Sequence, residues 1–188
     1  MPRIIGTNLT EHREETRRRV FEAFAALLAE RGYDAISMAD LAAEAGIGRT
    51  AIYNHFPSKD AVVVALAGDE TARYLQGLAA ALDEVSGPVE QLRVYVRHHL
   101  ASAEDFHLGL GPELYGMLSR DALTEIRAHV VEVERVLGDI LAAGMATGDF
   151  RIDDARAVIS LVHACLQPRH LDAPAVEAFV LRGVGAAV

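Results

Sequence analysis

Apolar side chains recur every three to four residues along most of the chain, which is the period of an α-helix with one buried face. A clear example is the apolar stripe made by Val20, Phe21, Phe24, Leu27 and Leu28. The two-residue alternation of a half-buried strand is not sustained anywhere in the sequence. The pattern therefore predicts an all-α protein of about nine helices.

Capping residues, glycines and prolines set the expected ends of these helices. Thr10, Ser37 and Ser58 are suited to be N-caps, whereas Gly32 and Gly46 are suited to end a helix. The expected helices run approximately over residues 10–31, 38–45, 48–56, 59–85, 88–104, 113–119, 121–145, 153–167 and 173–185.

Residues 37–56 combine a Ser-capped helix, a turn that contains glycine and a second short helix, which is the helix-turn-helix pattern. In DNA-binding versions of this pattern the second helix enters the major groove, and residues near its N-terminus meet base edges. Arginine can pair with guanine, asparagine with adenine, and the threonine methyl group can touch thymine. The candidate residues are Gly48, Arg49, Thr50, Tyr53 and Asn54. Spacing alone leaves an ordinary helical hairpin in a core as the alternative.

The formal net charge of -9 is unevenly distributed along the chain. Residues 1–60 carry eight Lys and Arg against nine Asp and Glu, whereas residues 61–188 carry ten against eighteen. The cations of the first third include a cluster at Arg13, Arg17, Arg18 and Arg19. Because a basic face matters more for phosphate contact than a basic whole, Arg17 joins the candidate DNA-binding residues. A solvated helix surface is the alternative for each of these arginines.

The stretch FAALLAERGYDAISMADLAAEAGIGRTAIYNHFPSKDAVVVAL, from Phe24 to Leu66, resembles the N-terminal DNA-binding domain of the TetR family of bacterial transcriptional regulators. Its most specific part is YNHFPSKDAV. The resemblance implies that Lys59, the only lysine of the chain, grips a DNA phosphate, and that Tyr53 and His55 also reach the DNA backbone. Free N–H groups at a helix N-terminus favour the same contact. Gly48 departs mildly from the family, which often has Ser or Thr as the cap.

The resemblance also implies two domains. These are a helix-turn-helix DNA-binding domain with a short N-terminal arm at residues 1–58, and a helical effector-binding and dimerisation domain at residues 59–188. Beyond residue 66 the resemblance rests on helix count and on the stretch GDFRIDDARAV. A homodimer is expected through the last two helices, and closure of the monomer core is the alternative. The apolar faces concerned consist of Ala157, Val158, Leu161, Val162, Ala164, Val176, Phe179, Val180 and Val184.

The expected function is that of a transcriptional repressor released from a palindromic double-stranded DNA operator by a small, largely apolar effector of unknown identity. Aromatic and methionine side chains at helical spacing line such pockets, although they more often form plain core. The candidate pocket residues are Tyr95, His99, Phe106, Leu110, Leu114, Tyr115, Met117, Leu118, His129 and Val133.

Two alternatives share the DNA-binding motif: an architectural DNA-binding protein without an effector, and a metal-sensing regulator. Six histidines follow residue 61, but they lack tight ligand spacing and Cys165 is the only cysteine. No Gly-rich phosphate loop or nucleophile elbow is present, so neither an enzyme nor a cofactor is expected. No apolar run approaches the roughly 20 residues that span a bilayer, and the first residues lack a secretory pattern. A cytoplasmic protein without a membrane partner is expected.

Overall fold

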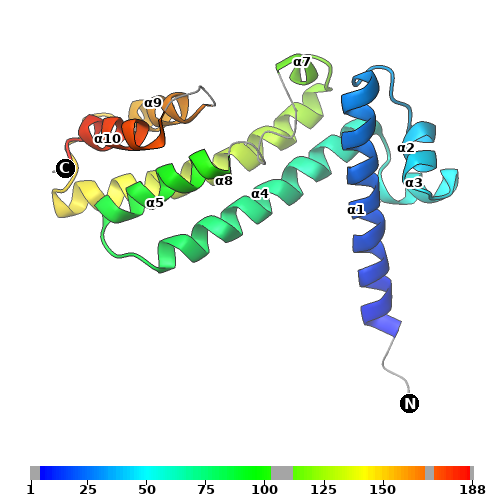
Figure 1. The fold of residues 1–188 in the computed structure, drawn as a ribbon, viewed down its shortest axis with the longest axis horizontal. Coiled ribbons are helices and arrows are strands. Elements are labelled where there is room, and N and C mark those ends of the chain that lie inside the picture. Colours follow the sequence, from blue (N-terminus) through cyan, green and yellow to red (C-terminus); the bar gives the residue numbers. More distant parts are fainter. Residues whose placement is uncertain (1–4, 103–111, 168–171, 187–188) are drawn as a thin grey trace. The chain divides into compact units, whose positions relative to one another are not determined.

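A computed structural model describes residues 5–102, 112–167 and 172–186 of the 188-residue chain. Most of these residues lie in helices, and no strand occurs among them (Figure 1). The all-α prediction is confirmed. The helices in chain order are α1 (Ile5–Arg31), α2 (Met38–Glu44), α3 (Arg49–His55), α4 (Lys59–Asp83), α5 (Pro88–Ala101), α7 (Pro112–Tyr115), α8 (Arg120–Thr147), α9 (Ala155–Leu166) and α10 (Ala173–Gly183).

The short helices begin at the capping residues that the sequence provides. At the start of α2, the Ser37 hydroxyl accepts a hydrogen bond from the Asp40 N–H at 3.2 Å, while the Ser37 N–H donates to the Asp40 carboxylate at 2.9 Å. This reciprocal pair is a capping box. The Asp154 carboxylate caps α9 by accepting from the N–H groups of Arg156 and Ala157 at 3.0 and 3.1 Å.

Two helix ends differ from the expected positions by more than three residues. Helix α1 begins at Ile5 rather than near Thr10, and α7 ends at Tyr115 rather than at Ser119. Ser119 is used differently because it stands directly before α8, where its hydroxyl accepts from the Ala122 N–H at 3.3 Å. A residue that caps one helix cannot also be the last residue of the preceding one.

The described residues form two compact units. The first contains residues up to Gly68 together with 112–126, and the second contains the rest of the described chain from Asp69 onward. Helices α4 and α8 therefore each contribute residues to both units. The division of functional domains at residue 58 stays a prediction.

The core of the first unit is built around the apolar stripe of α1. Val20 and Phe24 are fully buried there, and segment 112–126 adds several further side chains. Other members of this core are Leu27, Leu41, Ile52, Phe56, Val62, Val63, Leu66, Leu114, Leu118, Ala122 and Ile126.

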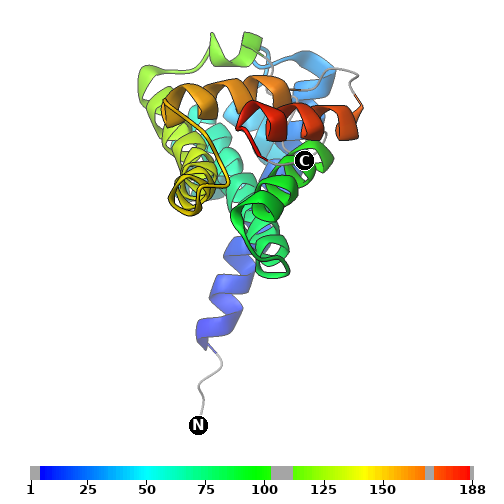
Figure 2. The same cartoon turned by 90° about the vertical axis from the view of Figure 1, so that its left-hand side faces the viewer.

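The second unit has its own core around Tyr95, which is fully buried. Phe150, in the connection between α8 and α9, lies so close to Gly144 that a Cβ atom there would overlap its ring. Helices α9 and α10 lie side by side in both views (Figures 1 and 2). The carboxylate of Glu177 in α10 accepts from Arg93 at 2.6 Å and from Arg97 at 2.5 Å, which fastens α10 to α5.

Candidate nucleic-acid interface

Helix α3 has one buried face and one exposed face. Ile52 is fully buried and Phe56, which follows the helix, is 2% exposed, whereas Tyr53 on the other side is 47% exposed. The remaining candidates for base contact also face solvent: Gly48, Arg49, Thr50 and Asn54. The residues that the sequence analysis assigned to base contact therefore all lie on the exposed side of α3 or at its N-cap. Their contact with DNA stays a prediction.

The turn between α2 and α3 is held by an arginine of α1. The Arg19 guanidinium donates to the carbonyl oxygens of Ala45 and Gly46, the latter at 2.9 Å. Gly46 has a φ of +62°, which side chains other than glycine rarely adopt, and a Cβ atom there would lie 2.7 Å from the Arg19 Nη2 atom. Arg19, counted among the basic residues of the helix surface, thus fixes the helix-turn-helix geometry.

The other arginines of the cluster on α1 differ in their surroundings. Arg18 pairs with Glu15 at 2.7 Å and with Glu22 at 2.5 Å, so its charge is compensated on the helix surface. The Arg17 guanidinium lies 5.4 Å from the centre of the Phe21 ring and 5.7 Å from that of Phe56. Because Phe56 directly follows α3, this cation–π contact places Arg17 at the C-terminal end of the proposed recognition helix.

His55 lies at the same end of α3 and is half-buried. Burial lowers the pKa of its imidazole below the ordinary value, and the charges of Arg13, Arg17 and His12 act in the same direction. The last turn of α3 and the facing part of α1 thus form a small cationic edge. Such an edge suits a DNA phosphate, although the sequence pattern alone did not show that the charges of Arg13 and His12 act on His55.

Lys59 is fastened within the protein at the first residue of α4. Its Nζ atom donates to the carbonyl oxygens of Tyr33 at 2.6 Å and Ile36 at 2.9 Å, and lies 3.9 Å from the centre of the Tyr33 ring. These contacts hold the turn between α1 and α2. An ammonium group has three donors, so one remains for the phosphate contact that the family resemblance implies. That contact stays a prediction, beside a structural role that the sequence did not reveal.

The candidate pocket residues are divided between the two units. Leu114 and Leu118 are buried in the first core, and Tyr115 and Met117 are each 40% exposed. In the second unit, Val133 belongs to the core together with Tyr95, and His129 is half-buried. Phe106 and Leu110 lie outside the described residues. A single pocket made by the whole set stays a prediction.

Tyr95 and His99 belong to a partly buried polar cluster that joins α4, α5 and α9 of the second unit. The Tyr95 hydroxyl is 2.7 Å from the His163 Nε2 atom, and the Tyr74 hydroxyl is 3.0 Å from the His99 Nδ1 atom. Burial lowers the pKa of His163. The four-residue spacing of Tyr95 and His99 on α5 could have indicated that they share a face. Nothing local in the sequence links either residue to Tyr74 or His163.

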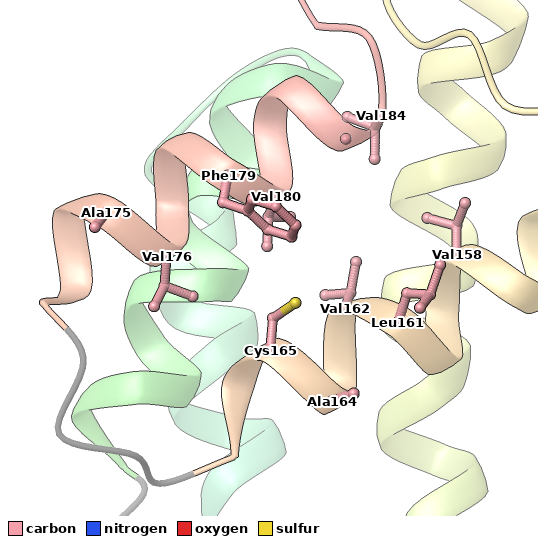
Figure 3. A pocket seen from close by; sticks show the side chains of 11 residues that line it. Val158, Leu161, Val162, Ala164, Cys165, Ala175, Val176, Phe179, Val180 and Val184 are labelled. Carbon is pink, nitrogen blue, oxygen red and sulfur yellow. The ribbon is translucent and has the colours of Figure 1, made fainter.

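An apolar groove of about 530 Å³ runs between α9 and α10 (Figure 3). Two of its large side chains are unusually exposed, because Leu161 is 64% and Phe179 is 61% accessible to solvent. Apolar surface of this kind typically marks an interaction site. The groove contains all but one of the residues expected for dimerisation; its lining is Val158, Leu161, Val162, Ala164, Cys165, Ala175, Val176, Phe179, Val180, Gly183 and Val184.

Over residues 5–102, 112–167 and 172–186, no three His, Cys, Asp or Glu side chains come together as a metal site requires. Within the same part of the chain, no helix combines the length and apolarity needed to cross a membrane.

Two family models match the chain. Residues 20–66 match that of the bacterial regulatory proteins of the tetR family, and residues 88–178 match the tetracyclin repressor-like C-terminal domain. The chain belongs to the TetR family. The first match covers the second part of α1, the helix-turn-helix and the start of α4, and the second runs from the start of α5 to the middle of α10.

Individual relatives agree with this assignment. The HTH-type transcriptional repressor AcnR of Corynebacterium diphtheriae is 30% identical over 139 residues, which cover 74% of this TetR-family chain and 66% of that protein. The fatty acid metabolism regulator protein of Bacillus subtilis is 22% identical over 137 residues, or 70% and 69% of the two chains. The crystal structure of the regulator FadR from Bacillus subtilis in complex with stearoyl-CoA is similar in fold, with a TM-score of 0.73 and 19% identity over 89% of this chain and 96% of that one.

If His55 of this TetR-family protein lies against a DNA phosphate, its affinity for DNA depends on pH. A phosphate raises the imidazole pKa, whereas in the free protein that pKa is lowered. DNA affinity should therefore rise as the pH falls from about 8 to about 6, because binding takes up a proton. Fluorescence anisotropy over this range measures the effect. His55→Gln should flatten the profile and His129→Gln should not; a slope that survives His55→Gln would assign it to another group.

Lys59→Met should distinguish the structural role of this lysine from its proposed phosphate contact. The substitution keeps an apolar side chain beside the Tyr33 ring but removes the charge and the hydrogen-bond donors. Loss of two hydrogen bonds to backbone carbonyls should destabilise the fold by about 1–3 kcal/mol, measured by urea denaturation. Loss of a phosphate contact should make the slope of log K against log[salt] shallower by about 0.9 per contact. A destabilised variant with an unchanged salt slope would restrict Lys59 to the structural role.

Proposed function

We propose that this TetR-family chain is a sequence-specific, DNA-binding transcriptional repressor. The observation that carries the proposal is the two-sided character of α3, which buries Ile52 while Arg49 and its exposed neighbours face solvent. A helix held in this way by a helix-turn-helix can enter the major groove and read base edges. Arg49 is suited to pair with guanine and Asn54 with adenine. The repressor AcnR, a curated relative, supports repression rather than activation.

The proposed assembly is a homodimer that forms through the α9–α10 groove and binds a palindromic operator. Leu161 and Phe179 support this because each leaves more than half of its apolar side chain in water in the single chain. A second copy placed on the groove by a two-fold axis would cover both residues with their own counterparts. Dimerisation also gives two copies of α3, and a palindromic site needs two reading helices about 34 Å apart.

The proposed regulation is release from the operator by a small, largely apolar effector that binds the second unit. The protein is taken to have two conformations, one that fits the operator and one that does not. The effector releases the operator only to the extent that it binds the second conformation more tightly than the first. The first chemical class to test is long-chain acyl thioesters, because the similar FadR structure from Bacillus subtilis is described as a complex with stearoyl-CoA. An effector-free architectural protein and a metal sensor stay as alternatives, and no contact described above favours either.

The DNA-binding function can be tested with the full-length protein and a pool of random-sequence duplexes. Rounds of selection should return a palindromic site. Arg49→Ala should then lower the affinity for that site by about 1–3 kcal/mol and relax the preference at one base position in each half-site. Mobility-shift titrations against the selected site and against unrelated DNA measure both effects. Equal losses on the two kinds of DNA would remove the base-reading role from Arg49.

The dimer can be tested by placing a charge in the groove. Leu161→Glu is tolerated in the monomer because position 161 is exposed there, but in a dimer the new carboxylate would be buried near its symmetry-related copy. The variant should be monomeric by sedimentation, keep its helicity and lose tight operator binding. Val131→Glu is the matched control, because Val131 on α8 is 48% exposed and does not line the groove. A dimeric Leu161→Glu variant would place the interface elsewhere.

A further inference from the structure

Asp60, the second residue of α4, receives hydrogen bonds from two segments that are far apart in the sequence. One carboxylate oxygen accepts from the hydroxyl of Tyr33, which lies in the turn between α1 and α2. The other accepts from the backbone N–H of Ser119 at 3.0 Å, directly before α8. All three residues belong to the first compact unit. A single carboxylate thus joins the turn that precedes α2 to the start of α8.

The Tyr33 side of this link leads to the DNA-reading helices. The Tyr33 ring is 4% exposed, and it packs edge-on against Phe24 with the ring centres 6.3 Å apart. Its carbonyl oxygen is held by Lys59. The ring and the backbone of Tyr33 are thereby both fixed, and Ser37, four residues further on, caps α2. We therefore expect a displacement of the Tyr33 hydroxyl to be passed to this turn and to the start of α2.

The Ser119 side of the link leads along α8. The Ser119 hydroxyl and carbonyl both take part in the first turn of α8, by accepting from the N–H groups of Ala122 and Leu123 at 3.3 and 3.0 Å. Its own N–H is left for a partner outside the helix, and Asp60 supplies that partner. Helix α8 then continues to Thr147 in the second unit. A shift at the start of α8 would change the bond between Ser119 and Asp60 directly.

The charge of the Asp60 carboxylate favours this double acceptance. Burial alone would raise the pKa of Asp60, but hydrogen bonds from Ser119 and Tyr33 and the nearby Lys59 charge outweigh it and hold the pKa below its ordinary value. The group is therefore ionised at neutral pH and accepts through both oxygens. Charge-assisted hydrogen bonds of this kind are shorter and stronger than neutral ones, which suits a link between two segments far apart in the sequence.

We propose that Asp60 is a positioning residue that couples the start of α8 to the DNA-reading helices, so that operator binding and the seating of α8 on α4 are linked. This inference rests on the proposed DNA-binding function and adds a route for its regulation. Coupling between two sites is reciprocal. If seating α8 favours operator binding, operator binding must in turn stabilise the start of α8, and this can be measured without knowing the effector.

Hydrogen exchange followed by mass spectrometry, on the full-length protein with and without the selected operator duplex, tests the proposal. In the wild type, the operator should slow deuterium uptake over residues 119–124 as well as in α3. Asp60→Ala and Tyr33→Phe should each abolish the slowing over residues 119–124, retain it in α3, and weaken operator binding by about fivefold or more. Tyr33→Phe keeps the buried ring, so it remains informative if Asp60→Ala does not fold.

Two further variants separate coupling from a general loss of stability. Asp60→Asn should restore much of the protection, because its amide can accept from the Ser119 N–H and donate to the Tyr33 oxygen. Ser37→Ala removes the cap of α2 without touching Asp60, so it should destabilise α2 but leave the operator effect over residues 119–124 intact. Protection there that persists in both Asp60→Ala and Tyr33→Phe would overturn the inference. A wild-type protein that binds no selected duplex would instead overturn the proposed function, and the inference with it.

Discussion

A helix of seven residues has almost no stability of its own in water, so the proposed recognition helix α3 depends on what it is packed against. Ile52 and Phe56 supply that packing, and the Phe56 ring lies 5.8 Å from the Phe21 ring of α1. Because these side chains fix the rotation of α3 about its axis, they also decide which of its residues face outward. The surface offered to DNA is in this sense a consequence of the core beneath it.

Two long cationic side chains stabilise the turns of the first unit by donating hydrogen bonds to backbone carbonyl oxygens. Arg19 holds the carbonyl groups between α2 and α3, and Lys59 holds those between α1 and α2. Both turns have carbonyl oxygens that would otherwise depend on water. The number of basic residues in the sequence therefore overestimates the number of phosphate contacts, because some basic side chains bind backbone carbonyl groups within the domain.

Local features of this fold could be predicted from the sequence, whereas pairings over long distances could not. The caps at Ser37 and the two-sided pattern of α3 depend on residues within one or two turns, and these predictions agree with the structure. The contact between Tyr95 and His163 spans 68 positions, and Ser119 meets Asp60 across 59. The hydrophobic periodicity of a helix does not indicate which distant residue its side chains will contact. The proposed effector pocket is difficult to predict for a different reason, because an apolar residue at helical spacing looks the same in the sequence whether it lies in a core or lines a cavity.

Glu177 has a consequence for how α10, the proposed interface helix, could diverge among related proteins. Its carboxylate, fixed by Arg93 and Arg97 on the inner side of α10, sets the axial position of that helix from within its own subunit. The outer side, where Phe179 projects, does not contribute to this anchoring. Substitutions on the outer side can therefore alter which copies recognise one another without shifting the helix that carries them. In the proposed homodimer, changes confined to this surface after gene duplication would let two paralogues form separate dimers while Glu177 keeps α10 in place.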